Sequence, residues 1–420
     1  QEERPRFQQT WGVNLRLVSI FDRSYAKKDT SWISSDVRFT ESLKEFLETP
    51  SDVMVELIGG MDPANQIIRT GLQQRRAVVT ANKILMARCG TDFLKLAAEM
   101  NSYLGFEASV AGGIPIIRVV QRSFFSDRIL RVRGILNGTC NYILSEMADG
   151  GGDYEEALAH AHSLGYAESD PSLDVSGGDT TDKLAILGTL CFNMRISPDQ
   201  IPTRGITEIV PVDFLYARRL DSTIKLLGVV ERNADVLSLR VSPFLVDNRL
   251  ALSKIFGVLN AVEITGATLG SVVISGKGAG GDPTAVSVVA DILNAALWKR
   301  DTLISNVGRT YPGELVPGVS IETGPFDQLA ISQEKERYPF YIRFFVKDRP
   351  GIISALANIL AERKINVDSV LQERWSDRSN LPFVITVEPT LFSTIQEAVD
   401  EMGKLEFNCA APCALPMLRL

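Results

Sequence analysis

One stretch in the middle of the chain limits the possible folds more than any other. Residues 161–183 read AHSLGYAESDPSLDVSGGDTTDK, in which acidic side chains alternate with glycine and proline. The pattern predicts a helix that begins at Asp153, with a carboxylate three residues later to complete a capping box, and ends at Gly165, which suits a left-handed backbone. A loop is expected over residues 168–178, where turn-forming residues recur. A second helix is then expected to open at Asp179.

The second helix brings a carboxylate and an ammonium group together. Asp179 and Lys183 are four residues apart and share one helix face, whereas Asp182 lies about 100° around the helix from Lys183. Gly177 and Gly178 come immediately before this face and allow a ligand to approach the backbone. A solvated acidic loop with a surface helix pair would give the same spacing, so spacing alone leaves both interpretations open.

The stretch also spells a longer motif, A-x3-G-Y-A-x2-D-P-x2-D-V-x-G-x-D-x3-K. On this motif the chain resembles homoserine dehydrogenases, and a match of this length is specific. The resemblance implies that Lys183 donates a proton to the substrate carbonyl. It implies that Asp179, Glu168 and Asp174 bind or orient the substrate, and that Gly165 lies against the cofactor.

Composition disfavours several other kinds of function. The formal net charge of −7 does not predict a broad basic surface, so we expect no nucleic-acid partner. No apolar run is long enough to span a bilayer, and five scattered cysteines favour a reduced, cytoplasmic protein. The only two histidines, His160 and His162, point to different helix faces. Histidine-based zinc sites and Ser-His-Asp catalysis are therefore disfavoured, and a general acid would be a lysine, a tyrosine or a carboxylic acid.

The N-terminal region is predicted to bind the adenosine end of a dinucleotide. Residues 15–20 alternate like a strand, and Asp22 and Arg23 follow it. An acid at this point suits the 2′-hydroxyl of NAD, and an arginine suits the 2′-phosphate of NADP. The sequence leaves the two cofactors open, with NADP favoured if Arg23 faces the site. A surface charge pair at a strand end is the alternative.

No G-x-G-x-x-G motif precedes this strand. The family that the chain resembles begins with a strand and a glycine-rich turn that holds the pyrophosphate, and this unit is missing. We expect a longer natural chain rather than impaired cofactor binding, because the rest of the cofactor half matches the family.

A strand–helix–strand pattern continues the cofactor half. The expected elements are a strand over 52–58, a helix over 63–72, a strand over 77–80, a helix over 92–101 and a strand over 104–106. Parallel sheets bind ligands at the carboxyl ends of their strands, where Gly59 and Lys83 fall. The TANK tetrapeptide that contains Lys83 also resembles homoserine dehydrogenases, which implies that this lysine lies near the nicotinamide or the substrate carboxylate. An ordinary loop lysine is the alternative.

The next segment, GFEASVAGGIPIIR, is interrupted by two glycines and a proline, which turn backbone carbonyls inward. In the family this loop binds a monovalent cation. The resemblance implies a sodium ion held by Glu107, Val110, Gly112 and Ile114, and oxygen-only ligation suits such a hard cation. The glycines also predict a hinge between domains, and the two roles are compatible.

The middle of the chain is expected to form the catalytic sheet. A half-exposed strand is predicted over 129–136, and the resemblance implies that the Asn-Gly-Thr tripeptide at 137–139 lies beside the active site. Residues 206–271 predict a mixed sheet that carries the substrate and a subunit interface. The glycine-rich segment 275–282, followed by a helix, predicts a phosphate-cradling turn. The resemblance implies that this helix returns to the cofactor half with Gly280 near the cofactor; a plain flexible turn is the alternative.

The C-terminal region is expected to form a small module of its own. Residues 306–337 lack periodicity and predict a linker. The strand–helix–strand–strand–helix–strand order over 338–420, with a D-x-P-G turn at 348–351, resembles an ACT domain. The resemblance implies a ferredoxin-like fold that binds an amino acid, with threonine the expected effector. A dimerising module without a ligand is the alternative.

These patterns together predict an α/β protein. We expect a Rossmann-like NAD(P)-binding domain, incomplete at its N-terminus, over 1–111 and completed by about 275–300, and a mixed α+β catalytic and dimerisation domain over 112–305, before the linker and the ACT domain. The predicted activity is the reversible, NAD(P)-dependent reduction of L-aspartate 4-semialdehyde to L-homoserine, which leads to threonine, methionine and isoleucine, in a homodimer or homotetramer. Two rivals are a catalytically silent amino-acid sensor and another semialdehyde or hydroxy-acid dehydrogenase on the same fold.

Overall fold

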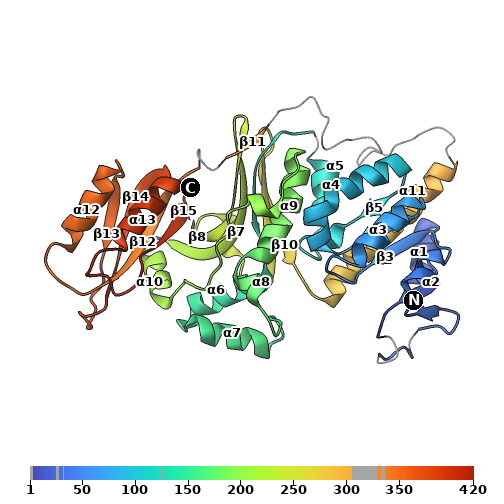
Figure 1. The fold of residues 1–420 in the computed structure, drawn as a ribbon, viewed down its shortest axis with the longest axis horizontal. Coiled ribbons are helices and arrows are strands. Elements are labelled where there is room, and N and C mark those ends of the chain that lie inside the picture. Colours follow the sequence, from blue (N-terminus) through green and yellow to red (C-terminus); the bar gives the residue numbers. More distant parts are fainter. Residues whose placement is uncertain (1–2, 25–27, 32, 125, 305–328, 333–335) are drawn as a thin grey trace. The chain divides into compact units, whose positions relative to one another are not determined.

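The structure is a computed structural model that describes residues 3–24, 28–31, 33–124, 126–304, 329–332 and 336–420. The chain divides into two compact units (Figure 1). The first contains residues 1–125 and 280–324, and the second contains residues 126–279 and 325–420.

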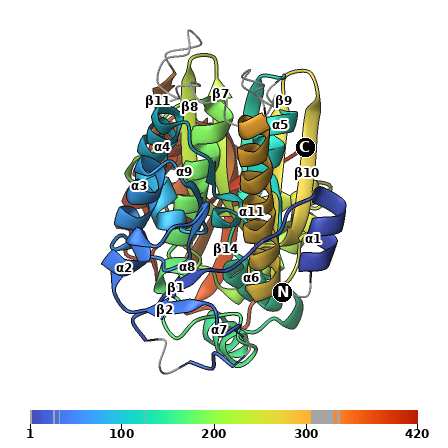
Figure 2. The ribbon, with the colours of Figure 1, turned by 90° about the vertical axis from the view of Figure 1, so that its right-hand side faces the viewer.

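The first unit is built around a three-stranded parallel sheet in the order β3-β4-β5. Helices α3 and α4 connect these strands and pack beside one another on one face, and α11 contacts the sheet from the other (Figures 1 and 2). The elements are α1 (Arg4–Trp11), β1 (Ser19–Phe21), β2 (Arg38–Thr40), α2 (Leu43–Glu48), β3 (Val53–Glu56), α3 (Ala64–Gln73), β4 (Ala77–Thr80), α4 (Lys83–Met100), β5 (Leu104–Gly105), the 3-10 helix η2 (Glu107–Ser109), α5 (Ile116–Ser123) and α11 (Gly281–Ile304). The predicted doubly wound pattern is confirmed for these strands.

Several boundaries in this unit differ from the prediction: the strand expected over 15–20 covers only Ser19–Phe21, the strand expected over 52–58 only Val53–Glu56, and the largest difference is at α4. The helix expected over 92–101 begins at Lys83, because Asn82 caps it by accepting a hydrogen bond from the Leu85 N–H at 3.1 Å. Lys83 is therefore the first helical residue rather than a loop residue. An asparagine cap of this kind satisfies one of the unpaired N–H groups of a helix start.

Among its described residues, the second unit contains a sheet of ten strands, of which nine follow the order β10-β9-β6-β7-β8-β15-β12-β14-β13 while β11 pairs with β8. Its first part comprises β6 (Ile129–Ile135), α6 (Gly138–Gly150), α7 (Tyr154–Ser163), α8 (Ser172–Val175), α9 (Gly178–Phe192), η3 (Pro198–Gln200), α10 (Pro211–Arg219), β7 (Ser222–Asn233), β8 (Val236–Asp247), η4 (Ala251–Lys254), β9 (Leu259–Gly266) and β10 (Gly270–Lys277). Helix α9 packs on β6 and β7, and α6 packs on β7 and β9. These contacts bring the starts of both helices to the catalytic sheet.

The prediction for this part is mostly confirmed. The capping box at Asp153, the left-handed Gly165 (φ 72°) and the mixed sheet are all present. Two short helices were missed: α8 lies in the expected loop over 168–178, and α10 lies in the region read as strands.

The C-terminal part adds the predicted ferredoxin-like order to the same sheet. Its elements are β11 (Ala330–Ile331), β12 (Arg337–Val346), α12 (Ile352–Glu362), β13 (Val367–Leu371), β14 (Leu381–Leu391), α13 (Phe392–Met402) and β15 (Cys413–Leu418). Strand β15 pairs in parallel with β8, and one hydrophobic cluster includes Leu227 and Phe244 together with Phe340 and Leu356. The ACT-like fold and the catalytic sheet therefore share a core. Most of the expected linker lies outside the described residues.

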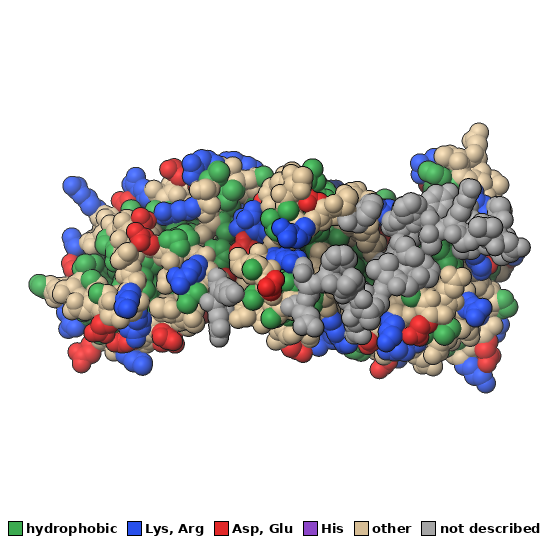
Figure 3. All heavy atoms as spheres, turned by 90° about the horizontal axis from the view of Figure 1, so that it is seen from above, with side chains coloured by type: hydrophobic (Ala, Val, Ile, Leu, Met, Phe, Trp, Pro, Cys, Tyr) green, Lys and Arg blue, Asp and Glu red, His purple; other side chains and the backbone are tan. Residues whose placement is uncertain are grey.

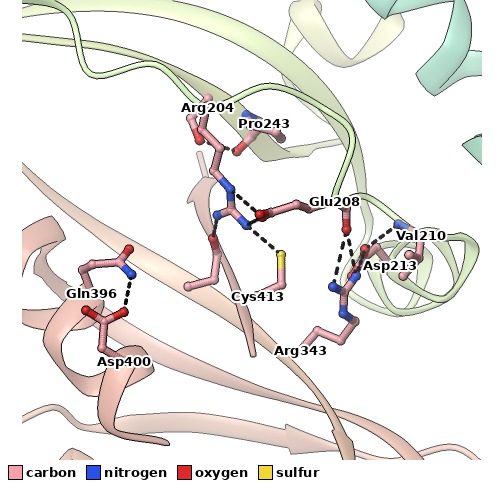
Figure 4. A network of polar contacts seen from close by, with 11 residues as sticks. Arg204, Glu208, Val210, Asp213, Pro243, Arg343, Gln396, Asp400 and Cys413 are labelled. Atoms are coloured by element: carbon pink, nitrogen blue, oxygen red, sulfur yellow. Dashed lines mark hydrogen bonds and ion pairs between the residues drawn. The ribbon is translucent and has the colours of Figure 1, made fainter. Parts of the chain in front are cut away.

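Polar contacts also join the C-terminal part to α10 and the segment before it. Arg343 of β12 pairs with Asp213 of α10 (Figure 4). The Tyr341 hydroxyl also donates to Asp213, at 2.7 Å. Arg204 donates to the Ala414 carbonyl at 2.6 Å and to the Cys413 sulfur at 3.0 Å. These contacts satisfy the network only in part, because Arg343 Nε is buried without a partner among the described residues.

The surface carries charges of both signs. On the face drawn in Figure 3, lysine and arginine side chains are interspersed with aspartate and glutamate side chains. Among the described residues, none of the helices combines the length and apolar character that crossing a membrane requires.

Candidate active site

The centre of the candidate site is a buried ion pair on the first turns of α9. The Lys183 ammonium lies 2.7 Å from Asp179 Oδ2 and donates a second hydrogen bond, at 2.8 Å, to the Leu136 carbonyl. Asp179 is 1% exposed and Lys183 9%. The helix starts after Gly177, whose φ of 89° and close contact with Thr203 (2.9 Å for an added Cβ) both require glycine. Backbone conformation and helical spacing thus fix the pair.

Asn137 organises the carboxylates around this pair. Its Nδ2 donates to Asp179 Oδ2 at 2.8 Å and to Asp174 Oδ1 at 2.7 Å, and its Oδ1 accepts the Cys140 N–H at 2.7 Å as the cap of α6. The start of α6 therefore faces two acidic side chains, which its dipole favours. Burial raises the pKa of the Cys140 thiol well above its usual value, and Asp174 and Asp179 raise it further.

This arrangement leaves the lysine with capacity for a ligand. An ammonium group has three N–H donors. Lys183 gives two of them to Asp179 and Leu136, and among the described residues no third acceptor is seen. The carboxylate and the carbonyl thus hold the nitrogen in place while one proton stays available to an oxygen atom. Such a donor in a water-poor site can stabilise charge that develops on oxygen.

The other predicted residues of this unit lie on the turn after α7. Gly165 and Glu168 are exposed, and Gly165 has open space where a side chain would begin. The Tyr166 carbonyl in this turn accepts the Thr139 hydroxyl at 2.7 Å. The turn is thereby tied to the start of α6, while Asp174 is half-buried against Asn137.

In the first unit, Gly59 lies in a hydrogen-bonded network at the carboxyl ends of β3 and β4, which ends at Asn82, the residue before Lys83. Buried Glu56 accepts from the Ile58 and Gly59 N–H groups at 2.7 and 3.1 Å and from the Thr80 hydroxyl at 2.6 Å. The Asn82 side chain, next to Lys83, donates to the Gly60 carbonyl at 2.8 Å. Gly59 and Gly60 have left-handed φ angles and open space where side chains would begin. An open backbone turn at this place fits a dinucleotide.

The residues predicted to lie near the adenosine of a dinucleotide already have partners within the chain. Asp22 pairs with Lys28 and accepts the Ser24 N–H at 2.8 Å. The hydrogen bond from Lys28 lowers the pKa of the Asp22 carboxyl to about 2, so this group is an anion at neutral pH. Arg23 is exposed.

The predicted cation loop surrounds a buried carboxylate. Glu107 accepts the Ile117 and Arg118 N–H groups at 2.8 and 3.0 Å, and Asp291 of α11 accepts the Glu107 N–H at 2.8 Å. Burial raises the pKa of the Glu107 carboxyl to about 7, which Arg118 opposes and Asp291 increases.

The backbone of this loop turns sharply at two consecutive left-handed residues, Ala111 (φ 54°) and Gly112 (φ 46°). Val110 and Ile114 are buried beside them, and the Gly112 carbonyl accepts the Ser287 hydroxyl at 2.7 Å. A left-handed alanine is uncommon and is retained where a turn is needed. The buried carboxylate and the turned backbone oxygens fit a hard monovalent cation.

Gly280 precedes α11 and has a φ of 114°, a conformation that side chains rarely adopt. The predicted glycine turn therefore needs glycine here. Two contributors to these sites were not foreseen from the sequence, the Leu136 carbonyl and Asp291. A carbonyl leaves no residue-type signal, and Asp291 meets Glu107 across 184 residues of chain.

Comparisons with known proteins agree with this geometry. The chain matches the family model of homoserine dehydrogenase over residues 115–293 and that of the ACT domain over residues 340–407. It is 36% identical to a homoserine dehydrogenase of Pseudomonas aeruginosa over 84% of this chain and 80% of that protein.

Solved structures give the same result. A homoserine dehydrogenase from Thiobacillus denitrificans superposes with a TM-score of 0.87 at 30% identity, covering 99% of this chain and 93% of that chain. A hyperthermophilic archaeal homoserine dehydrogenase in complex with NADPH superposes with a TM-score of 0.60 at 28% identity, covering 70% of this chain and 92% of that chain.

Proposed function

The chain belongs to the homoserine dehydrogenase family, and on that premise we propose that Lys183 and Asp179 carry the reversible reduction of L-aspartate 4-semialdehyde to L-homoserine. One observation carries the proposal. The buried Lys183 ammonium is held by the Asp179 carboxylate at 2.7 Å and the Leu136 carbonyl at 2.8 Å, with one N–H left for a ligand among the described residues.

The chain's own part in the reaction is proton transfer and orientation. A bound nicotinamide dinucleotide supplies the hydride. Lys183 donates a hydrogen bond to the aldehyde oxygen and gives up that proton as the alkoxide forms. Asp179 and Leu136 keep the nitrogen in position, and burial strengthens its interaction with the developing charge. In the reverse direction, neutral Lys183 takes the hydroxyl proton of homoserine.

The polar ends of the substrate call for charged partners. We propose that Glu168 and Asp174 bind the substrate ammonium, which is supported by their place on the segment between α7 and α9 that leads to Asp179. Lys83, on the first turn of α4, is proposed to contact the substrate carboxylate or the nicotinamide. Its capped helix start and the adjacent open glycine turn support this role.

For the cofactor we propose NADP as the preferred form. The Asp22 carboxylate already pairs with Lys28, and Arg23 is exposed beside it, so this strand end offers positive charge to a 2′-phosphate. The glycines proposed to lie against the cofactor are Gly59, Gly165 and Gly280.

We also propose a sodium ion at the loop formed by Glu107, Val110, Gly112 and Ile114. The buried carboxylate and the left-handed turn support it. The ion would neutralise Glu107 and hold the loop, so its role here is structural.

Regulation by threonine through the ACT domain is proposed on the family match and on the core that this domain shares with the catalytic sheet. A homodimer or homotetramer in the cytoplasm is proposed as well. The five cysteines are free thiols, which supports a reducing compartment.

The test combines an assay with calorimetry on the full chain. Aspartate semialdehyde is mixed with NADPH or NADH, the loss of reduced nicotinamide is followed, and NADPH and threonine are titrated separately. We expect turnover, heat from NADPH binding and heat from threonine binding. Heat from threonine with neither turnover nor NADPH heat would favour an amino-acid sensor instead.

A further inference from the structure

Glu56 is a buried carboxylate to which the proposed reaction assigns no role. It is the last residue of β3 and is 1% exposed. Among the described residues its partners are two backbone N–H groups and one hydroxyl, and no lysine or arginine pairs with it. A carboxylate is costly to bury without a cation, so its place here calls for an explanation.

The three hydrogen bonds join the ends of two strands to the glycine turn. One oxygen of Glu56 accepts the Ile58 and Gly59 N–H groups at 2.7 and 3.1 Å. The other oxygen accepts the Thr80 hydroxyl at 2.6 Å, and Thr80 is the fully buried last residue of the neighbouring strand β4. The carboxylate is therefore fixed on β4 through one oxygen and holds the turn through the other.

Side-chain packing contributes little to the shape of this turn. Leu57, Ile58 and Met61 are 60%, 45% and 40% exposed. A Cβ added to Gly59 or Gly60 would meet no described atom within 4 Å. Both glycines are left-handed, and glycine loses more conformational freedom on folding than any other residue. Hydrogen bonds therefore shape the turn, and two of them end on the buried carboxylate.

The same network reaches the start of α4. The Thr80 hydroxyl oxygen accepts the Asn82 N–H at 3.0 Å, and Asn82 is the cap of this helix. The Asn82 side chain donates to the Gly60 carbonyl at 2.8 Å, which closes the network on the far side of the turn. The carboxylate thus ties the glycine turn to the helix that begins at Lys83.

We propose that Glu56 is a positioning residue for the dinucleotide, whose carboxylate holds the turn at Gly59 and Gly60 in the shape that receives the cofactor without contacting the cofactor itself. The inference rests on the proposed dehydrogenase function, because Gly59 is one of the glycines proposed to lie against the cofactor. A turn that is ordered before the ligand arrives loses less conformational entropy on binding. The buried charge lowers the stability of the fold, and cofactor affinity gains.

The test separates affinity from stability. Glu56→Met removes both acceptor oxygens and keeps an unbranched side chain, so NADPH should bind about tenfold more weakly in calorimetry, as expected when hydrogen bonds that order a site are lost. The double variant Glu56→Met with Thr80→Val also removes the hydroxyl that the first change leaves unpaired. Its melting temperature should return toward that of the wild type, because both partners are now apolar, while NADPH affinity stays low. Recovery of affinity together with stability would overturn the inference, since a purely structural role predicts it.

Two controls locate the effect at the turn. Glu56→Gln keeps one oxygen for the two N–H groups and should retain NADPH affinity to within about threefold. Adenosine 2′,5′-bisphosphate reaches only the adenosine end, predicted at Asp22 and Arg23, so the wild type and all variants should bind it equally. Hydrogen exchange over residues 57–61 of the ligand-free protein should be faster in Glu56→Met.

The remaining outcomes are also decisive. Unchanged NADPH affinity in Glu56→Met, an equal loss for the adenosine fragment, or unchanged exchange at the turn would each overturn the positioning role. If Glu56→Met alone fails to fold, the double variant takes its place in every comparison. A wild type that binds no NADPH would overturn the dehydrogenase function itself.

Discussion

Two buried ion pairs in the second unit each join an aspartate to a basic side chain, but their surroundings differ. The Lys183 ammonium lies 2.7 Å from Asp179 in the candidate site, and the Arg343 guanidinium contacts Asp213 where β12 meets α10. Both carboxylates are at most 1% exposed, so burial does not distinguish the pairs.

The difference lies in what surrounds each pair, because Arg343 too keeps a buried Nε–H without a partner among the described residues. Asp213 also accepts the Tyr341 hydroxyl at 2.7 Å and the Val210 N–H at 2.9 Å, and Arg343 also reaches the Glu208 carbonyl at 3.4 Å. All of these partners belong to the fold, and Figure 4 shows Val210 and Glu208 among them. The pair acts as a connection between the C-terminal domain and the catalytic part.

Lys183 likewise has one N–H beyond its two acceptors among the described residues. Each cation therefore keeps an unpaired N–H, and spare capacity alone does not identify a catalytic pair. The Lys183 pair differs because Asn137 links it to a second carboxylate, Asp174, within the motif that the sequence predicted to hold the site. Removing the cation of each pair in turn tests whether the two pairs have different roles.

Lys183→Ala should give the largest effect. Turnover should fall by roughly two to four orders of magnitude, because the variant lacks the general acid. The kcat is measured with saturating aspartate semialdehyde and NADPH, and cofactor binding by calorimetry serves as the check on folding. Near-wild-type turnover by a variant that binds NADPH normally would exclude the proton-donor role.

Arg343→Met should behave in the opposite way. It leaves Asp213 buried without its cation, which costs about 3–5 kcal/mol of unfolding free energy. The turnover of the folded protein should stay within about twofold of the wild type, because no substrate contact is removed. Urea denaturation and kcat are measured on the same preparation.

The matched control is the double variant Arg343→Met with Asp213→Leu, which replaces the pair by apolar groups and should recover much of the lost stability. A single variant with full stability and a lost kcat would instead place Arg343 in the reaction and remove the contrast between the two pairs.

The sequence predicted the site pair and missed the structural pair for a physical reason. Asp179 and Lys183 are related by helical spacing, and the signals for the flanking helices are local. Asp213 and Arg343 meet across 130 residues, which no local pattern reveals. Two helix starts were missed although the sequence carries a signal for each. Asn82 is a helix cap before Lys83, and a proline at the first position of α10 suits a helix start.

A third cluster sharpens the comparison, because two buried carboxylates lie beside the same guanidinium. Arg118 lies 3.8 Å from Glu107 and 3.0 Å from Asp291, and Arg122 also acts electrostatically on Asp291. Burial raises the pKa of Glu107 from 4.5 to about 7. The folded state therefore holds this proton more tightly than the unfolded chain. The stability that it contributes is complete below about pH 4.5 and is lost as pH rises through 7.

Sodium at this loop would restore that stability once Glu107 has ionised. Replacing choline chloride by sodium chloride at equal ionic strength should raise the melting temperature by about 2–4 °C at pH 8 and by less at pH 6. Glu107→Gln keeps the size of the side chain and removes its charge, so it should abolish both the sodium effect and this part of the pH dependence. Lys183→Ala should retain both, because it lies in the other unit. An equal sodium effect in Glu107→Gln would mean that the ion binds elsewhere.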